Sequence, residues 1–108
     1  MNSLPAQSGQ HAVFWPGTRR KVDRKPLARR LDTLAGKTIA LLWGYLFRGD
    51  EAYGVIQAAL AERYPGVRFI GWDEFGSIHG NEEHRVVASL PERLEALGAD
   101  AVLTAMGC

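Results

Sequence analysis

The chain has 108 residues, of which 46% are hydrophobic and 23% are charged. This length suits one domain with a single core, and the composition is typical of a globular protein rather than a membrane protein. No apolar run approaches the roughly 20 residues that a bilayer-spanning helix needs. The sequence also lacks a secretory signal at its start, and its single cysteine excludes an intramolecular disulfide. We therefore expect a cytoplasmic protein in a reducing compartment.

An N-terminal arm, residues 1–36, contains three prolines and no clear hydrophobic period, so we expect at most one helical turn in it, near Leu27–Leu34. Its segment RRKVDRKPLARR, residues 19–30, has seven basic residues and one acidic residue, which leaves six basic and eleven acidic residues elsewhere. Such an arm can contact nucleic acid or an acidic partner, or fold back on its own acidic body. No aromatic residue or nucleic-acid motif accompanies the cluster, so contact with its own body is favoured.

Two strand and helix units follow the arm. KTIALLW, residues 37–43, is typical of a strand buried on both faces of a parallel sheet. After the loop GYLFRGDE comes a helical stripe that ends at YPG and comprises Ala52, Val55, Ile56, Ala59 and Leu60. VRFIGW, residues 67–72, predicts the second strand, and the loop DEFGSIHGNE follows it.

A second helical stripe comprises Val86, Leu90, Leu94 and Leu97. Pro91 interrupts it, and Ser89 is placed to cap a restarted helix, so we expect two helical pieces or one kinked helix. LGAD ends this region, and AVLTAM, residues 101–106, predicts the third strand.

The order β-α-β-α-β, with strand starts near 37, 67 and 101, predicts a parallel sheet with helical crossovers. We expect a flavodoxin-like three-layer α/β domain at residues 37–108, half of a larger fold, with strand order 2-1-3. One apolar edge strand then lacks a neighbour. We therefore expect residues 1–108 alone to be poorly soluble or oligomeric, with a second copy or a partner subunit covering this edge.

Ligands of open α/β sheets bind outside the carboxyl ends of the strands. The loops after Trp43, Trp72 and Met106 meet at that edge, where Cys108 follows the third strand. A thiol there is either a nucleophile or redox centre, or a bystander, and the sequence alone favours the bystander. The polar and charged residues within its reach are Arg48, Asp50, Glu51, Asp73, Glu74, Ser77 and His79.

His79 lies between two loop glycines and is a candidate acid or base, or a hydrogen-bonding group for substrate. His84 is expected on a helix surface, and its spacing of five from His79 does not favour a shared metal ion. No metal is expected.

Arg48 and Gly49, at the start of a helix, are candidates for an anion site together with Asp50, Glu51 and Ser77. Asp50 is more readily explained as a helix cap. GYLFRG does not match a nucleotide-binding glycine motif, so no bound cofactor is expected. Trp43, Trp72 and Phe75 either line a pocket or pack in the core.

The sequence resembles the N-terminal part of the UGSC family of selenoproteins and their cysteine homologues. The resemblance runs from Leu34 to Cys108, excludes the basic arm, and is carried by LFRGDE, RYPGV, FG with HG, and LGADAV in order. In that family the third strand leads into a Sec-Gly-Ser-Cys or Cys-Gly-Ser-Cys motif and then into a second α/β half. A similar strand and motif occur, more distantly, in selenoprotein B of glycine reductase.

This resemblance implies a selenol- or thiol-dependent oxidoreductase, with selenocysteine or the first motif cysteine just beyond Cys108. A selenolate is ionised at neutral pH, and the motif's last cysteine would resolve a selenenyl sulfide. We expect that these residues are a fragment, inactive alone, cut short because a UGA codon was taken as a stop. A UAA or UAG codon there, or no downstream frame for Gly-Ser-Cys, would contradict this.

Two other function classes stay open. One is an isomerase or lyase resembling aspartate and glutamate racemases, which acts on a small carboxylic acid and needs a second cysteine. The other is a non-catalytic subunit or anion-binding module, completed by a separate chain. A small-molecule substrate is expected in the first two classes, and neither nucleic acid nor a membrane is expected as a partner.

Overall fold

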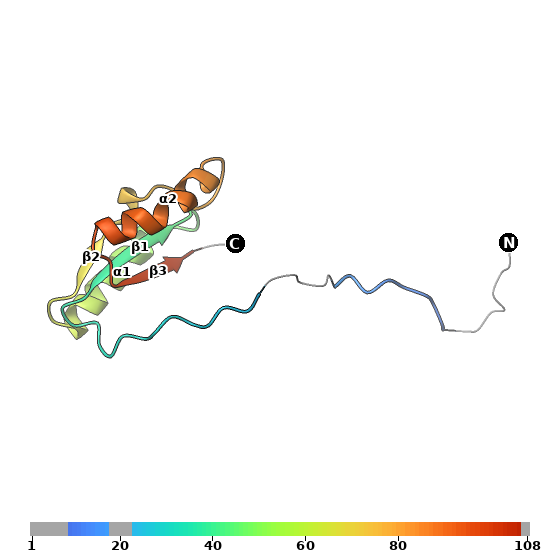
Figure 1. Cartoon of the computed structure of the whole chain (residues 1–108), viewed down its shortest axis with the longest axis horizontal. Helices are drawn as coiled ribbons and strands as arrows, with labels where there is room; N and C mark the ends of the chain where they lie inside the picture. Colours follow the sequence, from blue (N-terminus) through green and yellow to red (C-terminus); the bar gives the residue numbers. More distant parts are fainter. Residues whose placement is uncertain (1–8, 18–22, 107–108) are drawn as a thin grey trace.

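The computed structural model describes residues 9–17 and 23–106 (Figure 1). Three strands form one parallel sheet in the order β2-β1-β3, which confirms the predicted order and the predicted α/β half-fold. The elements in chain order are β1 (Thr38–Trp43), α1 (Gly49–Arg63), β2 (Arg68–Ile70), the short 3-10 helix η1 (Trp72–Glu74), α2 (Glu83–Ala96) and β3 (Ala101–Ala105). Within the described residues, no helix is long and apolar enough to cross a membrane.

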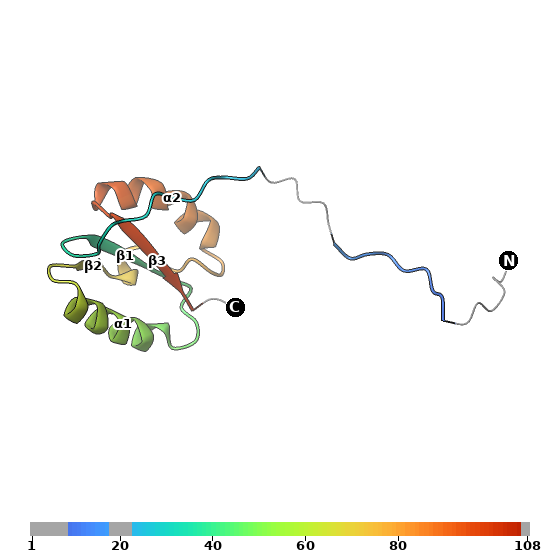
Figure 2. The same cartoon turned by 90° about the horizontal axis from the view of Figure 1, so that it is seen from below.

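The sheet lies between the two helices, with α1 on one face and α2 on the other (Figure 2). Every residue of β1 is buried, as expected for the central strand of a parallel sheet. Alternate side chains of β1 supply two cores because successive residues of a strand point to opposite faces. Ile39, Leu41 and Trp43 pack with Tyr53 of α1, whereas Ala40 and Leu42 pack with Phe75 on the α2 face.

The buried face of α1 only partly matches the predicted stripe: Ile56 packs against the core and Ala52 and Leu60 are partly buried, but the face is shifted toward Tyr53. Tyr53 is fully buried, while Val55 is 70% exposed and Ala59 is also exposed. The apolar residues of α1 occupy more than one side of the helix, so their spacing alone did not select the face. The large aromatic side chain of Tyr53 packs against β1, and this contact determines which face of α1 is buried.

Helix α2 is continuous from Glu83 to Ala96 with Pro91 inside it, so of the two predicted alternatives a single helix forms rather than two pieces. Ser89 does not cap a new helix. Its hydroxyl donates instead to the Val86 carbonyl, 2.7 Å away. Packing of Leu90 and Leu94 against the sheet stabilises the helix across the proline.

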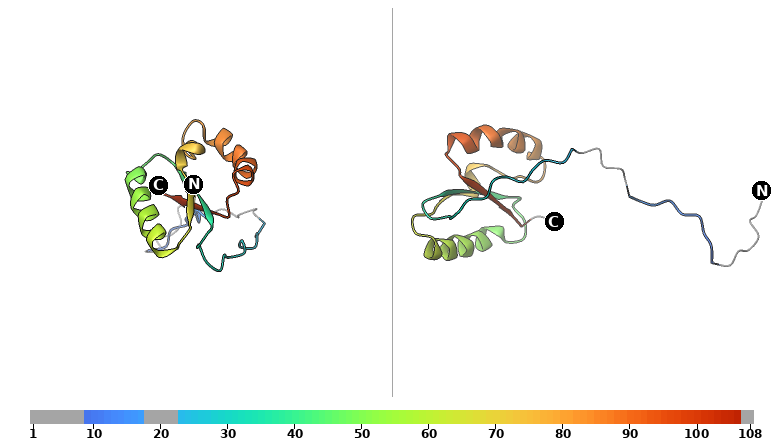
Figure 3. Two further views of the ribbon diagram at one scale, coloured as in Figure 1. Left: turned by 90° about the vertical axis from the view of Figure 1, so that its left-hand side faces the viewer. Right: turned by 60° about the horizontal axis from the view of Figure 1, so that its bottom comes forward.

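The last part of the arm, residues 27–34, is extended beside the start of β3 and has no helix, so the predicted turn was wrong (Figure 3). A short helix depends on burying an apolar face, and Leu27 is 91% exposed. Only the end of the arm joins a core, through Leu34. A groove of about 670 Å³ separates the arm from the first residues of β3.

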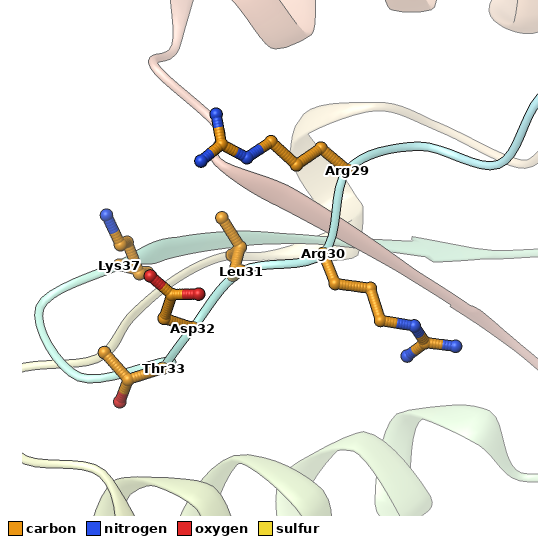
Figure 4. Close-up of a pocket in the computed structure, with 6 residues that line it drawn as sticks. All are labelled: Arg29, Arg30, Leu31, Asp32, Thr33 and Lys37. Atoms are coloured by element: carbon orange, nitrogen blue, oxygen red, sulfur yellow. The ribbon is translucent and has the colours of Figure 1, made fainter.

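The described basic side chains of the arm form no ion pair with the acidic body, although Arg29 and Arg30 line the same groove as Asp100. In residues 23–36, no Arg or Lys forms an ion pair. A hollow of about 390 Å³ near the end of the arm is lined by Arg29, Arg30 and Lys37, but Arg29 and Arg30 point to opposite sides (Figure 4). The rest of the basic cluster, residues 19–22, lies outside the described residues.

Candidate active site at the carboxyl edge of the sheet

Three chain segments lie side by side at the carboxyl edge. Trp43, the last residue of β1, pairs with Ala105 on one side and forms an isolated parallel bridge with Ser77 on the other. The Ile78 amide donates to the Trp43 carbonyl at 3.1 Å. The chain therefore leaves the sheet after β2, passes through η1 and returns beside β1. This brings the loops after Trp43 and Trp72 together beside the end of β3, whereas the segment after Met106 lies outside the described residues.

The loop from β1 to α1 is wrapped around the Trp43 indole. The indole N–H donates to the Leu46 carbonyl at 2.9 Å, and Gly49 lies so close that a Cβ there would be 2.1 Å from Nε1. Tyr45, Phe47 and Arg48 all have left-handed backbone conformations, with φ of 61°, 57° and 53°. Each left-handed residue costs about 1 kcal/mol of conformational free energy, and the contacts with the indole offset this cost and hold the loop in place.

Aromatic rings gather on the α1 side of this edge. The ring centroids of Trp43, Tyr45 and Trp72 are 4.7–5.2 Å apart, with Trp72 edge-on to both others. Trp43 is buried and Tyr45 is 45% exposed, so the cluster runs from the core to the surface. Phe75 is buried on the opposite face, so it packs in the core. The sequence pointed to the tryptophans but missed Tyr45, whose loop has no periodicity to reveal its direction.

Arg48, not Asp50, occupies the cap position of α1, and no side chain caps the helix. The prediction for Asp50 was therefore wrong, because the left-handed Arg48 starts the helix earlier. Asp50 and Glu51 lie exposed in the first turn, where negative charge stabilises a helix. The Arg48 guanidinium pairs with the Glu51 carboxylate. Its charge is thus already compensated, and the structure adds no support for an anion site there.

His79 and Ser77 belong to the loop that returns beside β1. The Ser77 hydroxyl donates to the His79 carbonyl at 2.6 Å and accepts from the His79 amide at 3.2 Å. His79 is exposed, and a Cβ on Gly44 would lie 3.1 Å from the His79 Cβ. His79 is therefore adjacent to the first residue of the β1–α1 loop.

The remaining acidic and histidine residues are on the surface. Asp73 and Glu74 are exposed in η1, and the Glu74 carbonyl accepts a hydrogen bond from the Arg93 guanidinium. His84 is exposed in the first turn of α2, as predicted. The part of the chain that the structure describes contains no group of three or more potential metal ligands.

The sequence model of the UGSC family matches residues 12–108. The chain belongs to the UGSC family. Because the match starts at Ala12, it includes the basic arm, which the resemblance was expected to exclude. The comparisons with curated proteins and with solved structures each gave no match.

In this UGSC-family chain, Tyr53 of α1 reaches across to the end of the β1–β3 pair. Its hydroxyl lies 2.6 Å from the Leu42 carbonyl and 3.1 Å from the Leu103 carbonyl. Burial raises the pKa of the Tyr53 phenol above its ordinary value of 10.0, and a backbone hydrogen bond with Ala105 opposes this in part. Sequence reasoning missed Tyr53 because it counted only aliphatic residues in the helical stripe.

The chain turns sharply where β3 ends. Met106 has φ of 57° and packs against the core cluster that contains Trp43 and Tyr53. Cys108, which the family resemblance places just before the reactive residue, lies outside the described residues. The direction in which the chain leaves the sheet toward it is set at Ala105 and Met106.

Proposed function

We propose that this chain is the N-terminal α/β part of a cytoplasmic selenol- or thiol-dependent oxidoreductase of the UGSC family. The reactive residue follows Cys108, shortly after β3 ends at Ala105. The observation that carries the proposal is the adjacency of Ser77, Trp43 and Ala105 at the carboxyl edge, the usual position for ligands in such sheets. The 108 residues contain one cysteine, so a two-residue redox centre needs residues beyond this sequence.

The chemistry is a two-electron exchange. A selenolate or thiolate attacks one sulfur of a disulfide substrate, so that the substrate's S–S bond breaks, a mixed bond forms and one thiolate leaves. The second motif cysteine then attacks the mixed bond, releases the other substrate thiol and leaves an internal Se–S or S–S bond. An external dithiol returns the two electrons. His79 supplies the proton to the leaving thiolate, a role supported by its exposed position next to Gly44.

The test requires the longer polypeptide that carries the motif, whose frame is read from the nucleotides after the Cys108 codon. One equivalent of oxidant should remove two hydrogen atoms from the reduced protein, and mass spectrometry should locate the new bond in the motif. Replacement of the first motif residue by serine should abolish both this bond and dithiol-dependent turnover. His79→Ala should slow turnover without preventing the bond.

Two results would contradict the proposal. One is the absence of an internal bond after oxidation. The other is interconversion of the enantiomers of a small carboxylic acid with no reductant present, which would instead support the racemase-like alternative.

A further inference from the structure

We propose that Tyr53 is a positioning residue, which fixes the carboxyl end of β3 and thereby places the reactive residue that follows it. This inference rests on the proposed function for its kinetic consequence only. Its structural part concerns the described residues and stands on contacts within them.

The contacts of Tyr53 join three elements at one point. The side chain comes from α1, and its hydroxyl lies over the sheet where Leu42 of β1 pairs with Thr104 of β3. The hydroxyl proton is shared between the Leu42 and Leu103 carbonyls. The hydroxyl is protonated and is a donor at neutral pH, as any tyrosine with an ordinary pKa near 10 would be, and burial raises the pKa of this phenol further.

β3 depends on such a contact because it is an edge strand. Among the described residues it pairs with β1 on one side only. Its side chains are at most half-buried, and Val102 is 44% exposed. Leu103 and Ala105 pack against the core on the α1 side, whereas Val102 and Thr104 are exposed. The strand is therefore packed on one face only, and its position also depends on the ladder with β1 and on a few side-chain hydrogen bonds.

Two side chains bind β3 to its neighbours, one near each end. At the amino end the Asp100 carboxylate accepts from the Thr38 amide at 2.9 Å. At the carboxyl end Tyr53 makes the contacts described above. Met106, which redirects the chain, packs against the cluster that includes Tyr53. Tyr53 thus acts next to the segment where the reactive residue follows, whereas Asp100 acts at the far end.

Tyr53 is not a catalytic residue. It is fully buried beneath the sheet and has no access to a substrate. Its effect on the reaction passes through the backbone of Leu103 to Met106. A small displacement of a reacting group is enough to lower the rate strongly.

The test compares Tyr53→Phe with Asp100→Ala, a control that removes the equivalent contact at the other end of the same strand. In the 108-residue chain, amide hydrogen exchange should increase about tenfold at Ala105 and Met106 in Tyr53→Phe, as expected for the loss of one buried hydrogen bond. The exchange rates of Ala101 and Val102 should change less in this variant. In Asp100→Ala, exchange should increase more at Ala101 and Val102 than at Ala105 and Met106.

In the longer polypeptide, Tyr53→Phe should lower kcat about tenfold with KM unchanged, because the reacting group is misplaced while substrate binding is retained. Asp100→Ala should leave kcat near that of the unmodified protein. Equal exchange increases along β3 in both variants, or no increase in Tyr53→Phe, would overturn the proposal. Equal losses of kcat in both variants would do so too. If the unmodified protein has no redox activity, the proposed function is wrong, and the exchange pattern still decides the role of Tyr53.

Discussion

Asp100 and Thr38 bind each other twice across the amino ends of β3 and β1. The Asp100 carboxylate accepts from the Thr38 amide at 2.9 Å, and the Asp100 amide donates to the Thr38 carbonyl at 2.8 Å. The two residues are 62 positions apart in the sequence, so this pair joins the first and last strands of the domain.

Asp100→Ala should destabilise the domain because it leaves the buried Thr38 amide without its acceptor. We expect the free energy of unfolding to fall by about 1–3 kcal/mol. Urea denaturation followed by tryptophan fluorescence should show a lower midpoint with an unchanged slope. Glu92→Ala, at an exposed position of α2, is the matched control and should change the free energy by less than about 0.5 kcal/mol. Equal stability of the two variants would contradict the role of Asp100.

Two glycines of α1 should respond to alanine with opposite signs. At Gly49 the new Cβ would lie 2.1 Å from the Trp43 Nε1, so the indole must move and lose its bond to Leu46. Overpacking of this kind costs about 1–3 kcal/mol. At Gly54 nothing lies within 4 Å of the new Cβ, and alanine in a helix interior gains about 0.5–1 kcal/mol over glycine.

Thermal unfolding and the Trp fluorescence maximum measure both effects. Gly49→Ala should lower the unfolding temperature and shift the emission of the Trp43 region, whereas Gly54→Ala should raise the unfolding temperature and leave emission unchanged. A stabilising Gly49→Ala would show that the loop is not packed on the indole.

Stability should decrease at high pH because of Tyr53. The pKa of its phenol is raised in the folded protein, so its contribution is complete below the unfolded value of about 10 and is lost as pH rises through the folded value. Urea midpoints measured from pH 8 to pH 11 should therefore fall more steeply above about pH 10 in the unmodified chain than in Tyr53→Phe. Parallel curves for the two proteins would contradict a buried, hydrogen-bonded phenol.

The outer edge of β3 should promote self-association. Within the described residues this edge has no neighbouring strand, and Val102 is exposed on it. We expect sedimentation velocity to show oligomers of the 108-residue chain at increasing concentration, and Val102→Lys to reduce them because a charge on an edge strand opposes pairing.

Val55→Lys is the control for this experiment, since Val55 is 70% exposed and belongs to α1 rather than to β3. It should leave the oligomers unchanged. A monomer at every concentration, or an equal effect of both lysines, would show that this edge does not direct association.

Much of the architecture was predictable from local patterns. The apolar run Thr38–Trp43 indicated a strand buried on both faces, and the crossover lengths led to parallel pairing in the order β2-β1-β3. The adjacency of the loops after Trp43 and Trp72 at the carboxyl edge followed from that topology. Asp50 and the segment near Leu27 were misjudged because cap and short-helix patterns do not include the neighbours that compete for the same groups.

By itself, the sequence determined the three strands, the two main helices and their order, since hydrophobic runs and periods are local properties of the chain. Only the tertiary structure decided that Tyr53 lies on the buried face of α1, that Ser77 lies beside Trp43, and that Arg48 is paired with Glu51. The first two depend on which residues far apart in the sequence meet in space. The third depends on a left-handed backbone that forms because the loop folds over the Trp43 indole.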